Sequence, residues 1–310
     1  MRRRLSLLLL VVLPLFPPDT AQGITIELHD AGQEPRRELR YQPVAGQREG
    51  LQMTLQMTMS AVLDGLPVPA VHLAPIQFRL GIRVLRVHSN GDFDTRTEMQ
   101  SVQLQSAPDA PEALRQQFRE QLAFLQSLRL DSTLSARGLT RAVTVNLDRS
   151  PPGMEDITGH IQQAIEQISM PLPQEAVGIG ARWTVTMPLV KNEMRLTNRV
   201  KVRLTRLEPG QAVFEVQVEQ QAAPQALPLG PHAPPGVRAQ LLSLEANGQG
   251  QLRLQFPHLV PTRSELDSRT ELVTQVFKGD ERQTLEHRIR LQLEVKRIPT
   301  AAPPSPAGGP

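Results

Sequence analysis

Hydrophobic residues recur with a period of two over most of the chain. In residues 51–63 every odd position is apolar, and the even positions are mostly polar. Successive side chains of a β-strand point to opposite faces, so this alternation predicts one long strand with one buried face. At about 3.3 Å per residue the strand would span roughly 43 Å, which favours a curved sheet over a flat one. Its apolar positions are Leu51, Met53, Leu55, Met57, Met59, Ala61 and Leu63.

Turn-forming sequences separate this strand from further runs of the same kind. The alternation resumes in residues 76–84 and then changes phase at Leu85, as a β-bulge would require. Asn90-Gly91 tolerates the positive φ angles of a tight hairpin turn and therefore predicts a hairpin at that point. By the same reasoning, further hairpins are predicted around Arg137-Gly138, residues 208–210, Asn247-Gly248 and residues 278–280.

The last strand-like run shows the clearest separation of two faces. One face carries apolar residues and a single histidine, whereas charged and polar residues occupy the positions between them. This pattern is typical of an antiparallel sheet with one packed and one solvated face. The predicted inner face consists of Leu285, His287, Ile289, Leu291, Leu293 and Val295.

Two segments, Pro111–Gln126 and Met154–Ser169, have apolar residues at helical spacing instead. Each would have one apolar side, so each predicted helix should lie against the sheet. The fold class expected from the whole pattern is mainly β (α+β). We expect a long curved antiparallel sheet or an incompletely closed β-barrel, with two amphipathic helices packed on it.

Charge and proline content predict the organisation of the chain. Arg2, Arg3 and Arg4 precede the apolar run 5–16, and a small-x-small sequence ends at Gly23, as in a secretory signal peptide. That run is shorter than the roughly 20 residues of a membrane span. We therefore predict a signal peptide at 1–23, a single β-rich domain at 24–298 and a disordered proline-rich tail at 299–310. Five prolines predict a loop at 222–236, and three more predict an irregular connection at 65–75.

Composition excludes several classes of function. The 34 Lys and Arg residues against 31 Asp and Glu give a net charge of +3. Three of the basic residues and Asp19 lie in the predicted signal peptide, so 31 basic and 30 acidic residues remain. This balance argues against a nucleic-acid-binding surface, which needs an excess of basic residues. The absence of cysteine excludes disulfide bonds, thiolate metal sites and a cysteine nucleophile.

The chain shows no recognisable catalytic motif. The seven histidines are scattered, and His287 is expected to be an interior residue. Asp92 with Asp94 and Glu265 with Asp267 are expected to be surface charges, and Gly178-Ile-Gly180 a turn. Trp183 is expected in the core. We therefore predict no catalytic residues, no cofactor, no metal and no enzymatic activity.

Two short sequences carry a resemblance to a known family. The run from Pro171 to Trp183, with the preceding residues 135–140, resembles a family of secreted or lipid-anchored bacterial proteins known chiefly as a domain of unknown function. The resemblance covers roughly residues 36–297, but this chain has no cysteine to acylate. More distantly, the order of long strands and two helices is similar to the lipoprotein- and lipid-carrier architecture, in which a curved sheet wraps an apolar cavity.

Three functional interpretations are possible after these exclusions, and the third, an outer-membrane β-barrel, is disfavoured because it needs girdles of aromatic residues and only nine aromatic residues lie beyond residue 23. The first is an exported soluble binding or carrier protein for an apolar small molecule or lipid, with a cavity lined by Leu51, Met53, Leu55, Met57 and Met59; Ile289 is not included in this set. The second is a structural or interaction protein of the bacterial cell envelope with a filled core and an envelope protein as partner. Both place the mature chain in the periplasm or outside the cell, without a membrane span.

Overall fold

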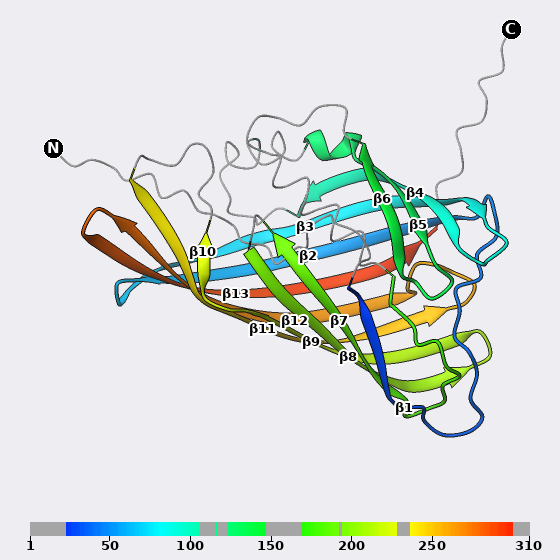
Figure 1. The fold of residues 1–310 in the computed structure, drawn as a ribbon. Helices are drawn as coiled ribbons and strands as arrows, with labels where there is room; N and C mark the ends of the chain where they lie inside the picture. The colour runs from blue at the N-terminus through cyan, green and yellow to red at the C-terminus, as the bar shows by residue number, and fades with distance from the viewer. Residues whose placement is uncertain are drawn as a thin grey trace, which may run out of the picture.

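The computed structural model describes residues 23–105, 116, 123–146, 169–191, 194–227 and 236–299. All the strands in these ranges belong to one 13-stranded antiparallel sheet, and the sheet is not closed into a barrel (Figure 1). Its strand order is β1-β7-β8-β9-β11-β12-β13-β2-β3-β4-β5-β6, and the short strand β10 pairs with β11. The mainly β, antiparallel and open fold predicted from the alternation is therefore confirmed.

The strands in chain order are β1 (Thr25–Asp30), β2 (Arg48–Leu63), β3 (Leu66–Val87), β4 (Phe93–Leu104), β5 (Arg129–Leu134), β6 (Thr140–Asn146), β7 (Arg182–Lys191), β8 (Met194–Glu208), β9 (Gln211–Ala222), β10 (Gln225–Leu227), β11 (Val237–Gln255), β12 (Arg263–Lys278) and β13 (Glu281–Ile298).

Four of the five predicted hairpins are present. They join β3 to β4, β5 to β6, β8 to β9, and β12 to β13. At the first of them Gly91 has a φ of 84°, the left-handed conformation that the Asn-Gly sequence was expected to supply. The bulge near Leu85 is also present as a register shift between Val84 and Arg86. Local turn chemistry was sufficient to locate these connections.

The hairpin predicted at Asn247-Gly248 is wrong, because both residues lie in the middle of β11. Asn247 pairs with Glu219 of β9 on one side and with Arg269 of β12 on the other. A Cβ atom added to Gly248 would lie 2.9 Å from the Cβ of Ser268, and one added to Gly250 would lie 2.1 Å from the carbonyl oxygen of Glu265. These glycines therefore permit a close approach of neighbouring strands, which is a second common use of glycine in a strand.

Two predictions based on proline also need correction. Residues 66–75, expected to be irregular, form the first half of β3. This half pairs with β2 only, because β4 begins to pair at Ile76, and an edge segment tolerates proline since one side needs no hydrogen bonds. Within the predicted loop 222–236, residues 225–227 form β10, and residues 228–235 lie outside the described ranges.

The two predicted helices are not seen. At the end of the first segment, the residues Phe124–Ser127 form a single 3-10 turn, and most of both segments lies outside the described residues. Of the described residues in this segment, Gln116 and Ala123 are also helical. No helix in those parts is long and apolar enough to cross a membrane.

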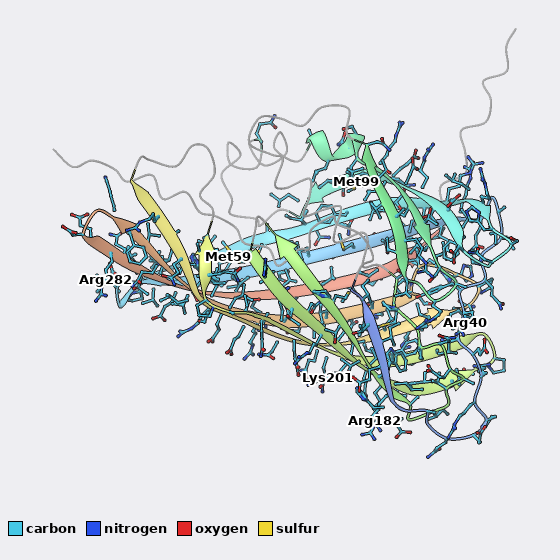
Figure 2. All side chains as sticks on the ribbon, viewed as in Figure 1. Arg40, Met59, Met99, Arg182, Lys201 and Arg282 are labelled. Atoms are coloured by element: carbon cyan, nitrogen blue, oxygen red, sulfur yellow. The ribbon has the colours of Figure 1, made fainter. Side chains whose placement is uncertain are left out.

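The sheet has an inner and an outer face with different side chains. In Figure 2, Lys201 and Arg182 lie on the outer face and Met59 lies on the inner face. Along β8 the inner-face residues Leu196, Val202 and Leu204 are buried, whereas the residues between them are mostly exposed. Strict alternation across long strands thus produces one apolar and one solvated surface, as the sequence predicted.

One end of the inner face is closed by two loop segments. Residues 31–47 and 169–181 connect the β1–β7 edge to the β5–β6 hairpin, through hydrogen bonds such as Tyr41 N to Ala136 O (2.8 Å) and Leu172 N to Arg137 O (2.9 Å). The largest fully buried side chains include Tyr41 of the first segment, together with Phe93 and Trp183 of the sheet. Trp183 packs edge-to-face on Phe214, with ring centroids 5.8 Å apart, so its predicted place in the core is confirmed.

Candidate functional site

The inner face can be described as rows of residues that are partners across neighbouring strands. One row runs from Trp183 of β7 and Val202 of β8 through Val216, Gly250, Leu266, Leu293 and Leu55 to Ile76 of β3 and Leu104 of β4. Trp183 and Val202 are buried, whereas the five aliphatic side chains from Val216 to Ile76 are only half-buried. We refer to Leu55, Ile76, Val216, Leu266 and Leu293 as the apolar band.

A half-buried aliphatic row differs from an ordinary core. The end of the sheet closed by loops contains residues such as Leu51, Leu80 and Leu204, which are 0% exposed. In the apolar band, β9 on one side of β11 and β12, β13, β2 and β3 on the other present partly accessible aliphatic side chains, four of which also pack against the main core. Contiguous exposed apolar surface of this kind marks interaction or ligand-binding sites more often than scattered single residues do.

Uncharged polar side chains occupy the inner face beside the apolar band. Asn198 of β8 pairs with Gln220 of β9, and the same row continues through Ala246 to Thr270 of β12. Ser268 lies one row closer to the apolar band, opposite Gly248. The exposed fractions of these side chains are 1% for Asn198, 3% for Gln220, 4% for Thr270 and 8% for Ser268. We refer to these four residues as the polar patch.

Asn198 carries a buried polar atom without a hydrogen-bond partner. Its Oδ1 atom is buried and has no hydrogen-bond partner in the structure. Its neighbours on the inner face include Met187 across the strand pair and Leu196 and Val200 along β8. Leaving a buried polar group unsatisfied costs about 1–3 kcal/mol, so such an atom requires an explanation.

The five predicted cavity-lining residues share the inner face but not one environment. Leu51 is 0% exposed in the main core. Met57 and Met59 are buried with Ile289 in a small separate cluster, although Ile289 was left out of the predicted set. Met53 and Leu55 are half-buried, and Leu55 belongs to the apolar band. The structure therefore shifts the candidate surface away from Met57 and Met59 and toward Leu55 and its row.

The two sequences that carry the family resemblance are brought together in the structure. Arg137 Nε donates to Leu172 O at 2.9 Å, and Ser169 Oγ donates to Gly138 O at 2.9 Å. A Cβ atom on Gly138 would lie 2.7 Å from both Tyr41 and Met170. Gly178-Ile-Gly180 forms a turn, as predicted. These sequences close the end of the sheet, so their role in the structure is architectural.

The histidines and carboxylates considered in the sequence lie apart from the polar patch, except for His287. His88 Nε2 lies 3.0 Å from Asp94 Oδ2, and this hydrogen bond is the main cause that lowers the pKa of Asp94. Asp92 is hydrogen-bonded within its own turn by Asn90, and Asp267 accepts from Arg290 on the outer face. Each of these carboxylates is thus engaged by a neighbour rather than paired with another acid.

His287 is half-buried on the inner face, between Leu272 and Ala61 in the row next to Thr270. Burial lowers its pKa, because a low-dielectric surrounding disfavours the imidazolium ion. The described part of the chain contains no group of three or more His, Asp or Glu residues arranged to hold a metal ion.

A buried carboxylate that the sequence analysis did not identify lies at the start of β2. Glu49 is 4% exposed and accepts hydrogen bonds from the backbone N–H groups of Leu259 and Val260, each at 2.9 Å. Gln47 Nε2 donates to it at 2.5 Å. Because its oxygens are occupied by the chain itself, Glu49 holds the β11–β12 connection in place.

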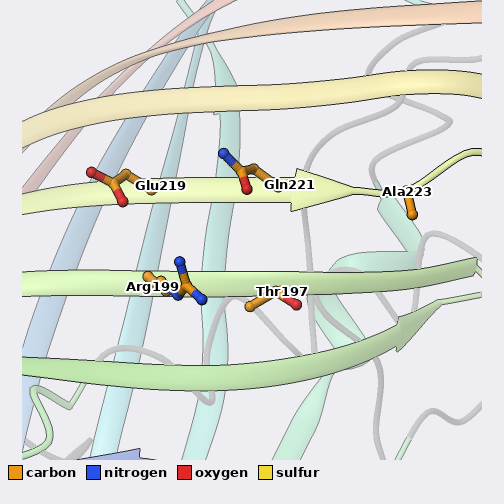
Figure 3. Close-up of a pocket in the computed structure, with 5 residues that line it drawn as sticks. All are labelled: Thr197, Arg199, Glu219, Gln221 and Ala223. Atoms are coloured by element: carbon orange, nitrogen blue, oxygen red, sulfur yellow. The ribbon is translucent and has the colours of Figure 1, made fainter. Parts of the chain in front are cut away.

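A depression of about 220 Å³ lies on the opposite, outer face of the sheet. Figure 3 shows its lining, which consists of Thr197 and Arg199 from β8, Glu219 and Gln221 from β9, and Ala223. It is polar and contains none of the residues predicted to line an apolar cavity.

Comparison with known proteins yields no family assignment. The sequence matches no protein-family model and no curated protein. Among solved structures, the secretin-domain β-barrel of InvG from the Salmonella SPI-1 injectisome is 11% identical with a TM-score of 0.15, over 86% of this chain and 66% of that chain. The Pseudomonas putida toluene transporter TodX is 10% identical with a TM-score of 0.14, over 82% of this chain and 90% of that one. At these scores the likenesses carry no argument about fold or function.

Sequence reasoning missed the polar patch for a specific reason. Asn198, Gln220 and Thr270 occupy inner-face positions of strands, but a polar residue in an apolar position only weakens the alternation signal. Nothing in the local sequence relates Asn198 to Gln220, or Thr270 to either, because the pairing joins three different strands.

Proposed function

We propose that this chain is an exported binding or carrier protein that holds an apolar or lipid-like ligand on the inner face of its curved sheet. The observation that supports this proposal is the apolar band, a row of half-buried aliphatic side chains across strands β9, β12, β13, β2 and β3. Such a surface stabilises a bound apolar molecule by about 25 cal/mol for each Å² removed from water.

Export is part of the proposal and rests on the charged, apolar and small-residue regions at positions 1–23. The ligand would be bound in the periplasm or outside the cell. Sequencing the N-terminus of the protein recovered from these compartments should give a start near Ile24. A start at Met1 in membrane-associated protein would contradict this part.

The alternative is a structural or interaction protein of the cell envelope, with a filled core and no ligand. Burial of Leu51, Met57 and Met59, three of the five residues expected to line a cavity, favours this alternative. The two functions differ in whether the apolar band is free to accept a molecule.

Enlarging a residue of the apolar band separates the two functions. Leu55→Trp should leave stability nearly unchanged if the band is open, but should abolish uptake of the apolar dye Nile red by occupying its site. In a filled core the same change forces strained packing, which typically costs about 1–3 kcal/mol. Dye fluorescence and the urea unfolding midpoint are the measurements.

Gln56→Trp is the matched control, because Gln56 is exposed on the outer face one residue away. It should change neither dye uptake nor stability. A wild-type protein that is folded but takes up no apolar probe, together with a large loss of stability in Leu55→Trp, would overturn the carrier function in favour of the structural one.

A further inference from the structure

The polar patch contains an atom that the folded chain leaves without a partner. Asn198 is 1% exposed, its Oδ1 accepts no hydrogen bond, and an amide oxygen can accept up to two. Replacing this residue by an aliphatic one of similar size would remove the cost of the unsatisfied atom. An amide at this inner-face position is thus unfavourable for the empty protein and becomes favourable when a donor is supplied from outside the chain.

The position of Asn198 relative to the apolar band determines what could supply that donor. The residue lies four positions before Val202 on β8, in the row of Val216 and the apolar band, which corresponds to about 13 Å along the strand. Val200 and Val218 lie in the row between and are half-buried, so the path from the band to the amide is apolar and partly accessible. A molecule lying on the band would thus reach the patch with one end.

The chemistry of the surrounding rows restricts that end to an uncharged group. The three rows that contain Asn198, Val200 and Val202 extend across strands β7 to β3, and none of their described members is charged. A carboxylate or phosphate placed there would lose its hydration without gaining a cation from these three rows, which is strongly unfavourable. A hydroxyl or amide can instead donate to Asn198 Oδ1 and accept from the amide of Gln220.

We propose that Asn198, with Gln220 beside it, is the polar anchor of the ligand site. The ligand is an uncharged amphiphile whose chain lies on the apolar band, and Asn198 Oδ1 accepts a hydrogen bond from its hydroxyl or amide headgroup. This inference rests on the proposed carrier function. It adds that the ligand is an alcohol- or amide-type lipid and not a fatty-acid or phosphate anion.

Two ligands that differ in one donor test the inference directly. The purified protein is loaded with Nile red and titrated with 1-dodecanol or with its methyl ether, which has nearly the same apolar surface but donates no hydrogen bond. The alcohol should displace the dye at a concentration about tenfold lower than the ether, the factor expected for one buried hydrogen bond. Dodecanoate at about pH 8, where the carboxyl group is ionised, should be the weakest competitor.

Variants at the anchor and beside it complete the design. In Asn198→Leu the preference for alcohol over ether should disappear, and the urea midpoint of the empty protein should rise because the unsatisfied atom is gone. Met187→Leu is the control, since Met187 lies opposite Asn198 in the same row, and it should keep the preference. If Asn198→Leu does not fold, the preference for alcohol over ether can still be measured in the wild type and in Gln220→Leu, and these two measurements test the anchor.

Failure of the proposed anchor can be distinguished from failure of the carrier function. Equal displacement by alcohol and ether in the wild type, or an unchanged preference in Asn198→Leu, would overturn the anchor while leaving the carrier function intact. A folded wild-type protein that binds neither dye nor alcohol would overturn both.

Discussion

The two faces of the sheet are built from alternate residues of the same strands, yet they contribute to the molecule in different ways. On the outer face, residues of neighbouring strands pair as ions, such as Lys201 with Glu219 and Arg288 with Glu271. These pairs are solvated, so each adds little to stability. On the inner face the strands bury aliphatic surface, which is the dominant favourable contribution to folding. Substitutions that change the size or polarity of a side chain should therefore destabilise the protein on the inner face and have little effect on stability on the outer face.

The most severe test of this difference uses neighbouring residues of β11. A side chain at Gly250 would meet the backbone oxygen of Glu265, which cannot move without breaking the β11–β12 pairing. Gly250→Ala should therefore cost more than about 4 kcal/mol of unfolding free energy, or prevent folding. Gln249→Ala, on the exposed outer face, should change it by less than about 0.5 kcal/mol. Similar urea midpoints for the two variants would contradict the close approach of these strands.

The next test compares a buried and an exposed residue of β13. Ile289 is 5% exposed against Met59, whereas Arg288 is exposed on the other face. Ile289→Asn should cost roughly 3–5 kcal/mol, because it removes buried apolar surface and buries an amide. Arg288→Asn should be nearly neutral. Chemical denaturation measures both, and a loss of stability in Arg288→Asn as large as in Ile289→Asn would disprove the assignment of faces.

A smaller effect is expected when the pH is changed. His287 has a pKa below its usual value of 6.5 in the folded state, so the unfolded chain binds the proton more readily. Stability from this residue should be complete above about pH 6.5 and should fall as the pH drops through 6.5 toward the lower pKa of the folded state. His287→Leu should have a shallower dependence of unfolding free energy on pH between about 7 and 5.

The smallest effect is expected at an exposed ion pair. Asp267 accepts from Arg290 at 2.6 and 3.2 Å, and this hydrogen bond is the main cause that lowers the pKa of the carboxyl group. Arg290→Gln should raise the pKa of Asp267 toward its usual value, which NMR titration of the carboxyl carbon would detect. The unfolding midpoint near neutral pH should hardly change. A large drop in stability would show that the outer face contributes more than its exposure suggests.

The same dipeptide shows how far turn chemistry predicts this fold. Asn90-Gly91 forms the expected hairpin turn, whereas Asn247-Gly248 continues a strand that is paired on both sides. In the second case Gly248 and Gly250 alternate with exposed residues in the same way as the apolar residues that follow them, Leu252 and Leu254. The period-two pattern therefore continues through Gly248 and Gly250, but glycine has no apolar side chain, so the alternation of hydrophobic and polar residues is not visible at these positions.

The candidate site was predicted less well than the fold. Leu55 was identified, because its apolar alternation is local, but the other members of the apolar band were not grouped with it. Ile76, Val216, Leu266 and Leu293 come from four other strands, and the long β11 brings β9 and β12 together. Glu49 was missed because its partners, Leu259 and Val260, lie more than two hundred residues away.

The sequence by itself determined most of the strands and turns and the face to which most strand residues belong, because these depend on neighbours along the chain. The tertiary structure alone decided which residues share a row. The strand order places β13 beside β2 and β11 between β9 and β12, and the register then sets Asn198 against Gln220. Shifting any pair by two residues would preserve every face and change every row, so alternation cannot reveal the polar patch or the apolar band.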